Sequence, residues 1–271
     1  MKIDLHVHGA PWENSWAAYR QAVWYGWKAG LEVIGICEHG PRFNHRVPFR
    51  SLYLSELDKY FDILEEIRLE FAGEIEVLFG IELDYNENTA EYYDDLLPRF
   101  PLDYVVGSLH TVRDWVVDLP GSFQESSLSG LDSKGLYEVY FEEMKNAAQT
   151  GLFNFIAHPD FVKKALPHLK MEKPQDVTDI YRDAAKMLSA CETGIEINTR
   201  GRILSDVGEY YPADEFLLQC GQAGVPLTIG SDAHDPKMTG SEVEEAALHA
   251  KKLGYRELSI WRKRKRYSLT I

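Results

Sequence analysis

Seven short apolar runs alternate along the chain with longer stretches of helical spacing, and this alternation constrains the fold more than any other feature. The runs are rich in Val, Ile, Leu and Tyr, which favours β-strands. They cover residues 3–7, 33–37, 76–83, 104–109, 154–157, 195–198 and 226–229. The stretches that repeat with a helical period lie at 15–29, 55–71, 133–150, 177–192, 214–223 and 241–253.

Strands that alternate with helices pair in parallel, because each helix carries the chain back to the same edge of the sheet. Six or more such units without a break in composition favour a closed α/β barrel of the TIM type, so we expect residues 1–271 to form one domain. A doubly wound open sheet is the alternative. The first strand-to-helix turn, residues 8–11, lacks the glycine motifs of dinucleotide sites and of P-loops.

The charge balance excludes several classes of function. The sequence holds 29 Lys and Arg against 43 Asp and Glu, and its net charge of -14 disfavours broad binding to nucleic acid. No stretch approaches the roughly 18 apolar residues that a membrane span requires, and the first residues do not resemble a secretory signal. Three scattered cysteines are too few for a disulfide framework. We expect a cytoplasmic protein without nucleic-acid or membrane partners.

Two segments do not fit the alternation. Residues 111–133 have the weakest pattern, and we interpret them either as a loop over the active face or as a disordered surface insertion. Residues 262–266 concentrate five positive charges close to the end of the chain, and we expect them to form a solvated tail.

Potential metal ligands follow the apolar runs. His6 and His8 alternate with apolar residues, so in a strand they share a face and can coordinate one metal ion. Further ligand-type residues stand at the ends of later runs, namely His39, Glu82, His110, His158, Asp232 and His234. All strands of a parallel barrel end on the same face, so these side chains should meet there. A single histidine at a strand end is commonly structural, but six of the nine histidines share this placement, which predicts a metal centre.

The ligand types indicate the metals and the chemistry. Imidazole and carboxylate without thiolate suit Zn, Mn or Fe, and eight ligands suffice for two or three divalent ions. A carboxylate such as Glu82 would bridge a pair of ions, an arrangement used for phosphoester displacement. Coordination lowers the pKa of water from 15.7 to about 7 and so supplies a hydroxide nucleophile. We expect Glu82 and Asp232 to act catalytically through the metals, and His234 or a metal-bound water to protonate the leaving alkoxide.

A small phosphate ester as substrate also needs positive groups at the same face. Candidates for substrate binding follow the ligand-bearing strands, namely Arg42, Arg113, Lys163, Arg200 and Arg202. Guanidinium groups bind phosphate oxygens in a bidentate manner, which places Arg200 or Arg202 ahead of the lysine as anchors.

The order of these ligand-type residues along the chain, from His6 and His8 to Asp232 and His234, resembles that of the polymerase and histidinol phosphatase (PHP) superfamily. The resemblance covers nearly the whole chain. The histidinol-phosphatase branch of this superfamily is suggested by Glu196-Ile197-Asn198-Thr199, by Tyr211-Pro212, and by residues 230–234 followed by Pro236. The resemblance implies a distorted (β/α)7 barrel with two or three metals. It also implies hydrolysis of L-histidinol phosphate to L-histidinol and phosphate.

The resemblance further implies how the ligands divide among the ions. One metal would be held by His6, His8, Glu82 and Asp232, a second by Glu82, His110 and His158, and a third by His39 and His234. In the family, another histidine soon after the first pair commonly completes the third site. Residues 9–20 contain none, and Glu13 is the candidate replacement. Two alternatives stay open: a phosphoesterase for a nucleotide or sugar phosphate, and a metal-binding regulatory protein without turnover.

Overall fold

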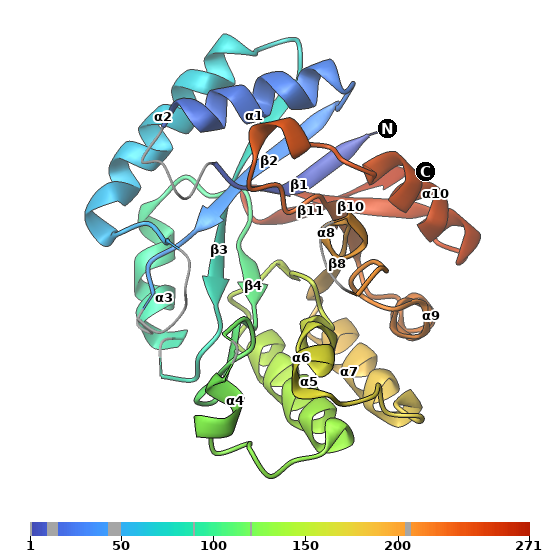
Figure 1. Cartoon of the computed structure of the whole chain (residues 1–271). Coiled ribbons are helices and arrows are strands. Elements are labelled where there is room, and N and C mark those ends of the chain that lie inside the picture. The colour runs from blue at the N-terminus through green and yellow to red at the C-terminus, as the bar shows by residue number, and fades with distance from the viewer. Residues whose placement is uncertain (1, 10–15, 43–49, 89, 120, 204–206) are drawn as a thin grey trace.

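Seven parallel strands form one curled sheet in the computed structural model, which describes residues 2–9, 16–42, 50–88, 90–119, 121–203 and 207–271 (Figure 1). The strands are, in spatial order, β1 (Ile3–Val7), β2 (Val33–His39), β3 (Glu76–Asp84), β4 (Val106–Ser108), β7 (Phe155–Ile156), β8 (Gly194–Asn198) and β9 (Leu227–Gly230). The segment after β9 returns to β1, where Val7 bridges Ala233 in parallel and the Asp232 N–H donates to the His6 carbonyl at 2.7 Å. The sheet is therefore a nearly closed seven-stranded barrel, as the alternation predicts.

Helices cover the outside of this barrel. Those that match the predicted stretches are α1 (Ala17–Lys28), α2 (Leu57–Glu70), α5 (Ser133–Gln149), α7 (Thr178–Ala190), α9 (Asp214–Ala223) and α10 (Val243–Lys252). Shorter elements join them, namely α3 (Ala90–Leu96), α4 (Ser122–Glu125), α6 (Leu166–Leu169), α8 (Arg200–Ile203) and the 3-10 turns Leu54–Glu56, Leu97–Arg99, Phe161–Lys164 and Pro236–Met238. Of the helices in the described ranges, none has both the length and the apolar character that crossing a membrane would need.

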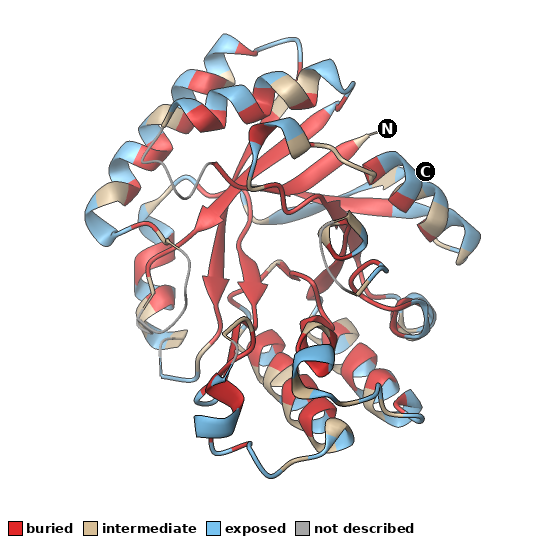
Figure 2. Ribbon diagram, in the orientation of Figure 1, coloured by how far each residue is buried: buried red, intermediate tan, exposed pale blue. Residues whose placement is uncertain are grey.

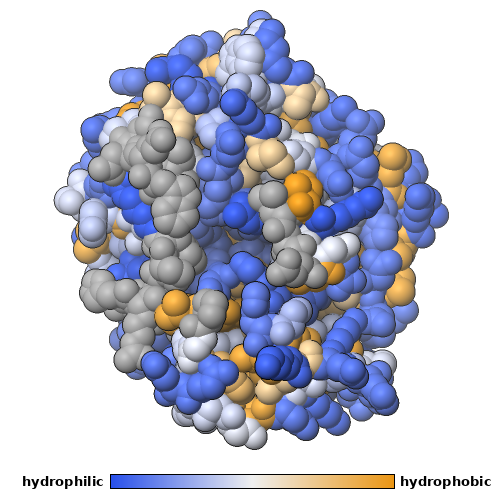
Figure 3. Space-filling model, viewed as in Figure 1, coloured by the Kyte–Doolittle hydropathy of each residue, from blue (hydrophilic) through white to orange (hydrophobic). Residues whose placement is uncertain are grey.

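The burial pattern follows from this layering. Residues of the seven barrel strands are buried almost throughout, whereas the long helices turn their exposed residues outward (Figure 2). The face in view in Figure 3 is largely hydrophilic, with apolar side chains in small patches, and it is hollowed near its middle. A parallel sheet enclosed by helices requires this pattern, because each strand packs against the barrel interior and against a helix.

Tyr104 fills part of the barrel interior. Its hydroxyl donates to the Leu5 carbonyl at 2.8 Å, and its ring stacks on Phe155 with 5.6 Å between centroids. Gly35 and Gly80 make room for this ring, because a Cβ at these positions would lie 2.0 and 2.5 Å from Tyr104 atoms. The interior is thus packed with side chains at this level.

The weakly patterned segment after His110 is an ordered excursion. It forms a small antiparallel hairpin of β5 (Thr111–Val112) and β6 (Trp115–Val116), which α4 follows. Trp115 is buried, and the Val117 N–H donates to the His110 carbonyl at 2.8 Å. The alternative of a disordered insertion is therefore wrong for the described residues, and the contact with His110 fits the interpretation as a loop over the active face.

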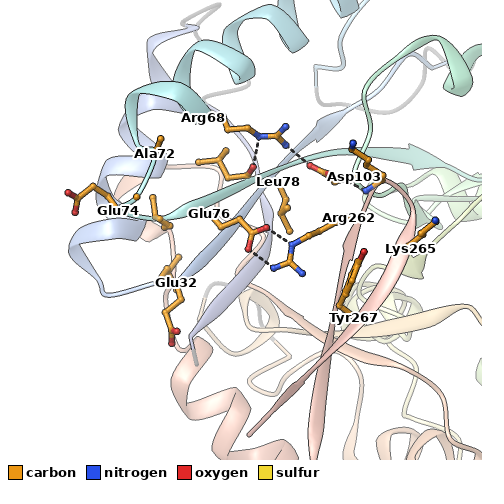
Figure 4. Close-up of a pocket in the computed structure, with 15 residues that line it drawn as sticks. Glu32, Arg68, Ala72, Glu74, Glu76, Leu78, Asp103, Arg262, Lys265 and Tyr267 are labelled. Atoms are coloured by element: carbon orange, nitrogen blue, oxygen red, sulfur yellow. Dashed lines mark hydrogen bonds and ion pairs between the residues drawn. The ribbon is translucent and has the colours of Figure 1, made fainter.

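The basic segment near the end of the chain is not a solvated tail, so that prediction is wrong. It joins β10 (Glu257–Arg262) and β11 (Lys265–Thr270) into an antiparallel hairpin. Figure 4 shows the groove between this hairpin and the start of β3, where the Arg262 guanidinium meets the Glu76 carboxylate. The two contacts measure 2.5 and 2.6 Å. This bidentate pair fixes Arg262, one of the five charges that the sequence pattern assigned to solvent.

Asp103 anchors the turn of that hairpin. Its Oδ1 accepts the Lys263 N–H at 3.0 Å, while Oδ2 accepts the Phe79 N–H at 3.0 Å and lies 2.5 Å from Arg68 Nη2. Lys263 and Arg264 both have positive φ, at 50° and 66°. A non-glycine residue in this region costs about 1–2 kcal/mol, so the bonds from Asp103 offset strain in the turn.

Replacing Asp103 by Ala should lower the free energy of unfolding by about 2–4 kcal/mol, because two backbone N–H groups and one guanidinium lose their acceptor. Urea titration followed by circular dichroism would measure the change. Glu74→Ala is the control, since Glu74 is an exposed acid in the same groove, and its effect should stay within about 0.5 kcal/mol. Equal effects of the two substitutions would contradict the role given to Asp103.

Candidate metal centre

All eight residues predicted as metal ligands converge at the carboxyl ends of the strands. They form three groups whose ligand atoms lie within 4.8 Å of one another. The groups are His6, His8 and Asp232; Glu82, His110 and His158; and His8, His39 and His234. Seven of these side chains are buried, and His234 is partly exposed.

The Glu82 carboxylate lies at the centre of the three groups. Its Oε2 is 2.6 Å from His39 Nδ1 and 3.6 Å from the Nε2 atoms of His6 and His8. Its Oε1 faces the other way, 3.4 Å from His158 Nε2 and 3.8 Å from His110 Nε2. One carboxylate is therefore shared among five imidazoles, which is the geometry of a bridging ligand.

Two further carboxylates orient the histidines of β1. Glu196 lies 3.0 Å from His6 Nδ1, and Glu38 lies 3.3 Å from His8 Nδ1. An ionised carboxylate only accepts hydrogen bonds, so Nδ1 carries the proton in both rings and Nε2 presents its lone pair to the centre. This is how buried carboxylates fix the tautomer of metal-binding histidines.

The donors fit a divalent metal. The Nε2 atoms of His6 and His8 are buried and make no hydrogen bond with any described residue. Buried polar atoms rarely go without a partner, so two such nitrogens aimed at shared carboxylates point to a cation as the missing partner. Nitrogen and carboxylate oxygen without sulfur suit Zn, Mn or Fe, as the sequence suggests.

The charges within the centre favour a positive species there. Burial opposes ionisation of Glu82 and Asp232, but neighbouring histidines hold the pKa of both carboxyl groups well below the usual range. Burial also works against a charge on His8, yet Asp232 and Glu38 raise its pKa to about 9. For His234, burial and the charge of His8 lower the pKa to about 4. A neutral imidazole at this position suits a metal ligand better than a proton donor.

Two residues of the centre have unusual backbone conformations. His158 and Asp232 lie in the left-handed region with φ of 31° and 52°. Hydrogen bonds hold both, because the His158 N–H donates to Glu196 Oε1 at 2.8 Å and the Asp232 N–H donates to the His6 carbonyl. Strain of about 1–3 kcal/mol per residue is typical of functional sites where the surroundings fix the geometry.

Two of the predicted substrate-binding residues lie beside the centre. Arg42 Nη2 is 3.1 Å from His39 Nδ1. Arg200 Nη1 is 2.9 Å from His234 Nδ1 and donates to the Asp232 carbonyl at 2.9 Å. These two guanidinium groups flank the histidines expected at the third ion.

The other three predicted substrate-binding residues have different partners. Arg113 is exposed and lies 3.8 Å from Glu143, and Arg202 lies 3.3 Å from Glu242. Lys163 is buried among the Tyr210 carbonyl, Asp160 and Glu209, at 2.7, 3.0 and 2.9 Å. The structure does not bring these three side chains together with the ligand groups. Glu13 lies outside the described residues.

The orienting role of Glu38 and Glu196 was not predicted from the sequence. Glu196 had a detectable signal, because it stands inside the apolar run of β8 and shares a face with Asn198. Asn198 Nδ2 donates to Glu196 Oε1 at 2.7 Å and confirms that the two face each other. An acid within a buried strand needs a partner, so its position alone could have indicated a site.

The fold and the site define a class: α/β barrel proteins that gather histidines and acids at the carboxyl ends of their strands to hold metal ions. A family model described as the PHP domain matches residues 4–200. The chain therefore belongs to the PHP domain family.

Relatives match over the full length of the chain. A Deinococcus radiodurans protein described as "Probable histidinol-phosphatase" is 29% identical over 261 residues, 95% of each chain. A "Histidinol-phosphatase" of Lactococcus lactis is 24% identical over 262 residues, 96% of this chain and 94% of that one. A solved structure from Lactococcus lactis, histidinol phosphate phosphatase complexed with Zn, L-histidinol and phosphate, superposes with a TM-score of 0.79 at 22% identity and covers 98% of each chain. This likeness supports the assignment of the fold.

Glu196→Gln should weaken metal binding about 10- to 100-fold while the protein stays folded. The amide oxygen would take over the bonds from the His158 N–H and Asn198, which leaves the amide nitrogen facing His6. The His6 ring would then change tautomer and lose the lone pair that it presents to the centre. Competition with a chromophoric chelator for Zn would measure the affinity.

Glu192→Gln is the matched control, because Glu192 is an exposed acid just before the same strand. Its metal affinity should equal that of the unmodified protein. An unchanged affinity in Glu196→Gln would show that Glu196 does not orient His6.

Proposed function

We propose that this protein is a metal-dependent phosphomonoesterase that hydrolyses L-histidinol phosphate to L-histidinol and phosphate. The observation that carries the proposal is the Glu82 carboxylate shared among five imidazoles, with arginines beside it. Carboxylate-bridged metal pairs are used for displacement at phosphorus. The choice of substrate is supported by full-length relatives described as histidinol-phosphatases.

The donors divide naturally among two or three ions. His6, His8 and Asp232 would hold one together with Glu82, and Glu82, His110 and His158 would hold a second. The group of His8, His39 and His234 offers a third position. When bound, such ions neutralise phosphate oxygens and lower the pKa of a water molecule towards neutrality.

The chain's own residues would bind and orient the ester. Arg42 and Arg200 are the phosphate contacts in this proposal, because their guanidinium groups are partly buried and lie beside the ligand histidines. Held there, they offset the charge of the phosphate oxygens as the bond to the alkoxide breaks. Asp232 and Glu82 keep the centre anionic, and we assign His234 as a ligand, so the proton for the alkoxide comes from water.

The proposal is tested by assaying the purified protein with L-histidinol phosphate beside a nucleotide, a sugar phosphate and other phosphomonoesters, with elemental analysis of bound metal. The highest kcat/KM is expected for L-histidinol phosphate. A preference for another ester would reject the substrate. Turnover of no ester with Zn, Mn or Fe would instead favour a metal-binding regulatory protein.

His8→Ala and Asp232→Ala should each reduce hydrolysis to the limit of detection, because each removes a donor at the shared centre. Far-UV circular dichroism should change little, since both side chains lie at strand ends. His249→Ala serves as the control, because His249 pairs with Asp214 between α9 and α10. Substantial activity in either site variant would show that the catalytic centre is misplaced.

Removing metal with a chelator should lower the melting temperature, because buried carboxylates and imidazoles lose the cation that compensates them. Binding to the folded state alone stabilises by about 4 kcal/mol at a thousandfold excess over Kd. Calorimetry before and after chelation would measure the shift, and added Zn or Mn should reverse it. The shift should be much smaller in Asp232→Ala. A shift of equal size there would assign the stabilisation to another site.

A further inference from the structure

A polar pair at the rim of the centre is not explained by metal binding. Asp118 follows β6 and Val117, and the Val117 N–H donates to the His110 carbonyl at 2.8 Å. This bond holds the backbone next to Asp118 beside His110, which belongs to the group of Glu82, His110 and His158. The Asp118 side chain keeps 14% of its surface exposed, so it is accessible yet largely enclosed.

Lys164 contacts both Asp118 and the Phe161 ring, which packs against His110 and His158. Its Nζ contacts Asp118 Oδ1 and lies 4.8 Å from the centre of the Phe161 ring. That ring packs against His158 at 4.6 Å and against His110 at 5.6 Å between centroids. Asp118 and Lys164 therefore lie just outside two of the expected ligands, and neither belongs to a metal-capable group of the described residues.

The charges around the centre are unevenly distributed. Arg42 and Arg200 flank His39 and His234, whereas the Asp118 carboxylate lies on the side of His110 and His158. Asp118 is close enough to Arg42 that its charge counters the effect of burial, which lowers the pKa of the guanidinium. The ammonium group of an amino-alcohol phosphate would be repelled by metal ions unless a carboxylate received that group.

Asp118 has a carboxylate oxygen available for this contact. Lys164 contacts Oδ1, and Oδ2 makes no hydrogen bond within the described chain. Asp118 and Lys164 also line a cavity of about 120 Å³, whose other walls include Trp115 and Phe123. The lining of this cavity includes none of the eight ligands and neither Arg42 nor Arg200, so the role of Asp118 rests on its Oδ2 and on its place beside Phe161 rather than on this cavity.

We propose that Asp118 is a specificity-determining residue that accepts a hydrogen bond from the ammonium group of the substrate. The preferred substrates are then phosphate esters of amino alcohols, with the phosphate on the arginine side and the ammonium at Asp118. This inference rests on the proposed function and adds the group that distinguishes L-histidinol phosphate from phosphate esters without a positive nitrogen.

The test compares two substrates in the metal-loaded enzyme, L-histidinol phosphate and p-nitrophenyl phosphate, which has no ammonium group. Asp118→Asn should lower the ratio of their kcat/KM values about 10- to 100-fold, the loss expected for a hydrogen bond between charged groups. L-histidinol should become a correspondingly weaker competitive inhibitor, while inhibition by inorganic phosphate should change less than about threefold.

Lys164→Met is the matched control, because it breaks the same ion pair and keeps the carboxylate. Its ratio should stay within about threefold of the unmodified enzyme. Asp118→Glu, which keeps the charge, should retain more of the ratio than Asp118→Asn and serves if the latter fails to fold. Each variant is checked by its melting temperature and by its Zn content.

The possible failures are distinguishable. An equal loss for both substrates in Asp118→Asn, or the same fall in ratio for Lys164→Met, would make the pair structural and overturn the assignment. An unchanged ratio in Asp118→Asn would do so as well, and the proposed function would stand. An unmodified enzyme that hydrolyses only esters without an ammonium group would reject both the substrate and the role of Asp118.

Discussion

The rest of the centre depends on one buried carboxylate. Glu82 faces five imidazoles from four strand ends, and no single protein hydrogen-bond pattern can satisfy all of those nitrogens at once. A buried cluster of this kind is costly unless a cation completes it. Because histidines and acids from distant parts of the chain share this requirement, the metal centre and the closure of the barrel are coupled.

The hydrogen bonds that close the barrel between β1 and the segment after β9 show this coupling. Asp4 accepts the N–H groups of Ser231 and Gly240, both at 2.9 Å, and so ties β1 to the segment that follows β9. Two residues further along β1, the His6 carbonyl receives the N–H of Asp232. The strand that carries the histidine pair is thus also the strand that closes the barrel, and a shift in its register would displace both.

Much of this could be predicted from local sequence. The run at 3–7 and the helix at 214–223 match the structure to the residue, since their apolar periodicity is strong. That the metal ligands meet in one place could be predicted from the topology, because all strands of a parallel barrel end on the same face. The prediction that failed concerns contacts between residues distant in the sequence. Within 262–266, Arg262 pairs with Glu76 and Arg264 donates to the carbonyl of Leu152, and no local pattern reveals such contacts.

Glu196 shows why orienting residues are harder to find than ligands. Its Oε1 receives the N–H of His158 and the amide of Asn198, while both of its oxygens lie near His6 Nδ1. A Cβ at Gly230 would lie 2.4 Å from Glu196 Oε2, so the glycine of the next strand is needed for the carboxylate to fit. A ligand is recognised by its own chemistry, but an orienting carboxylate is recognised only by what surrounds it. His6, His158 and Gly230 come from the ends of three other strands and define the role of Glu196 together with Asn198 of its own strand, and the three meet Glu196 only once the barrel has formed.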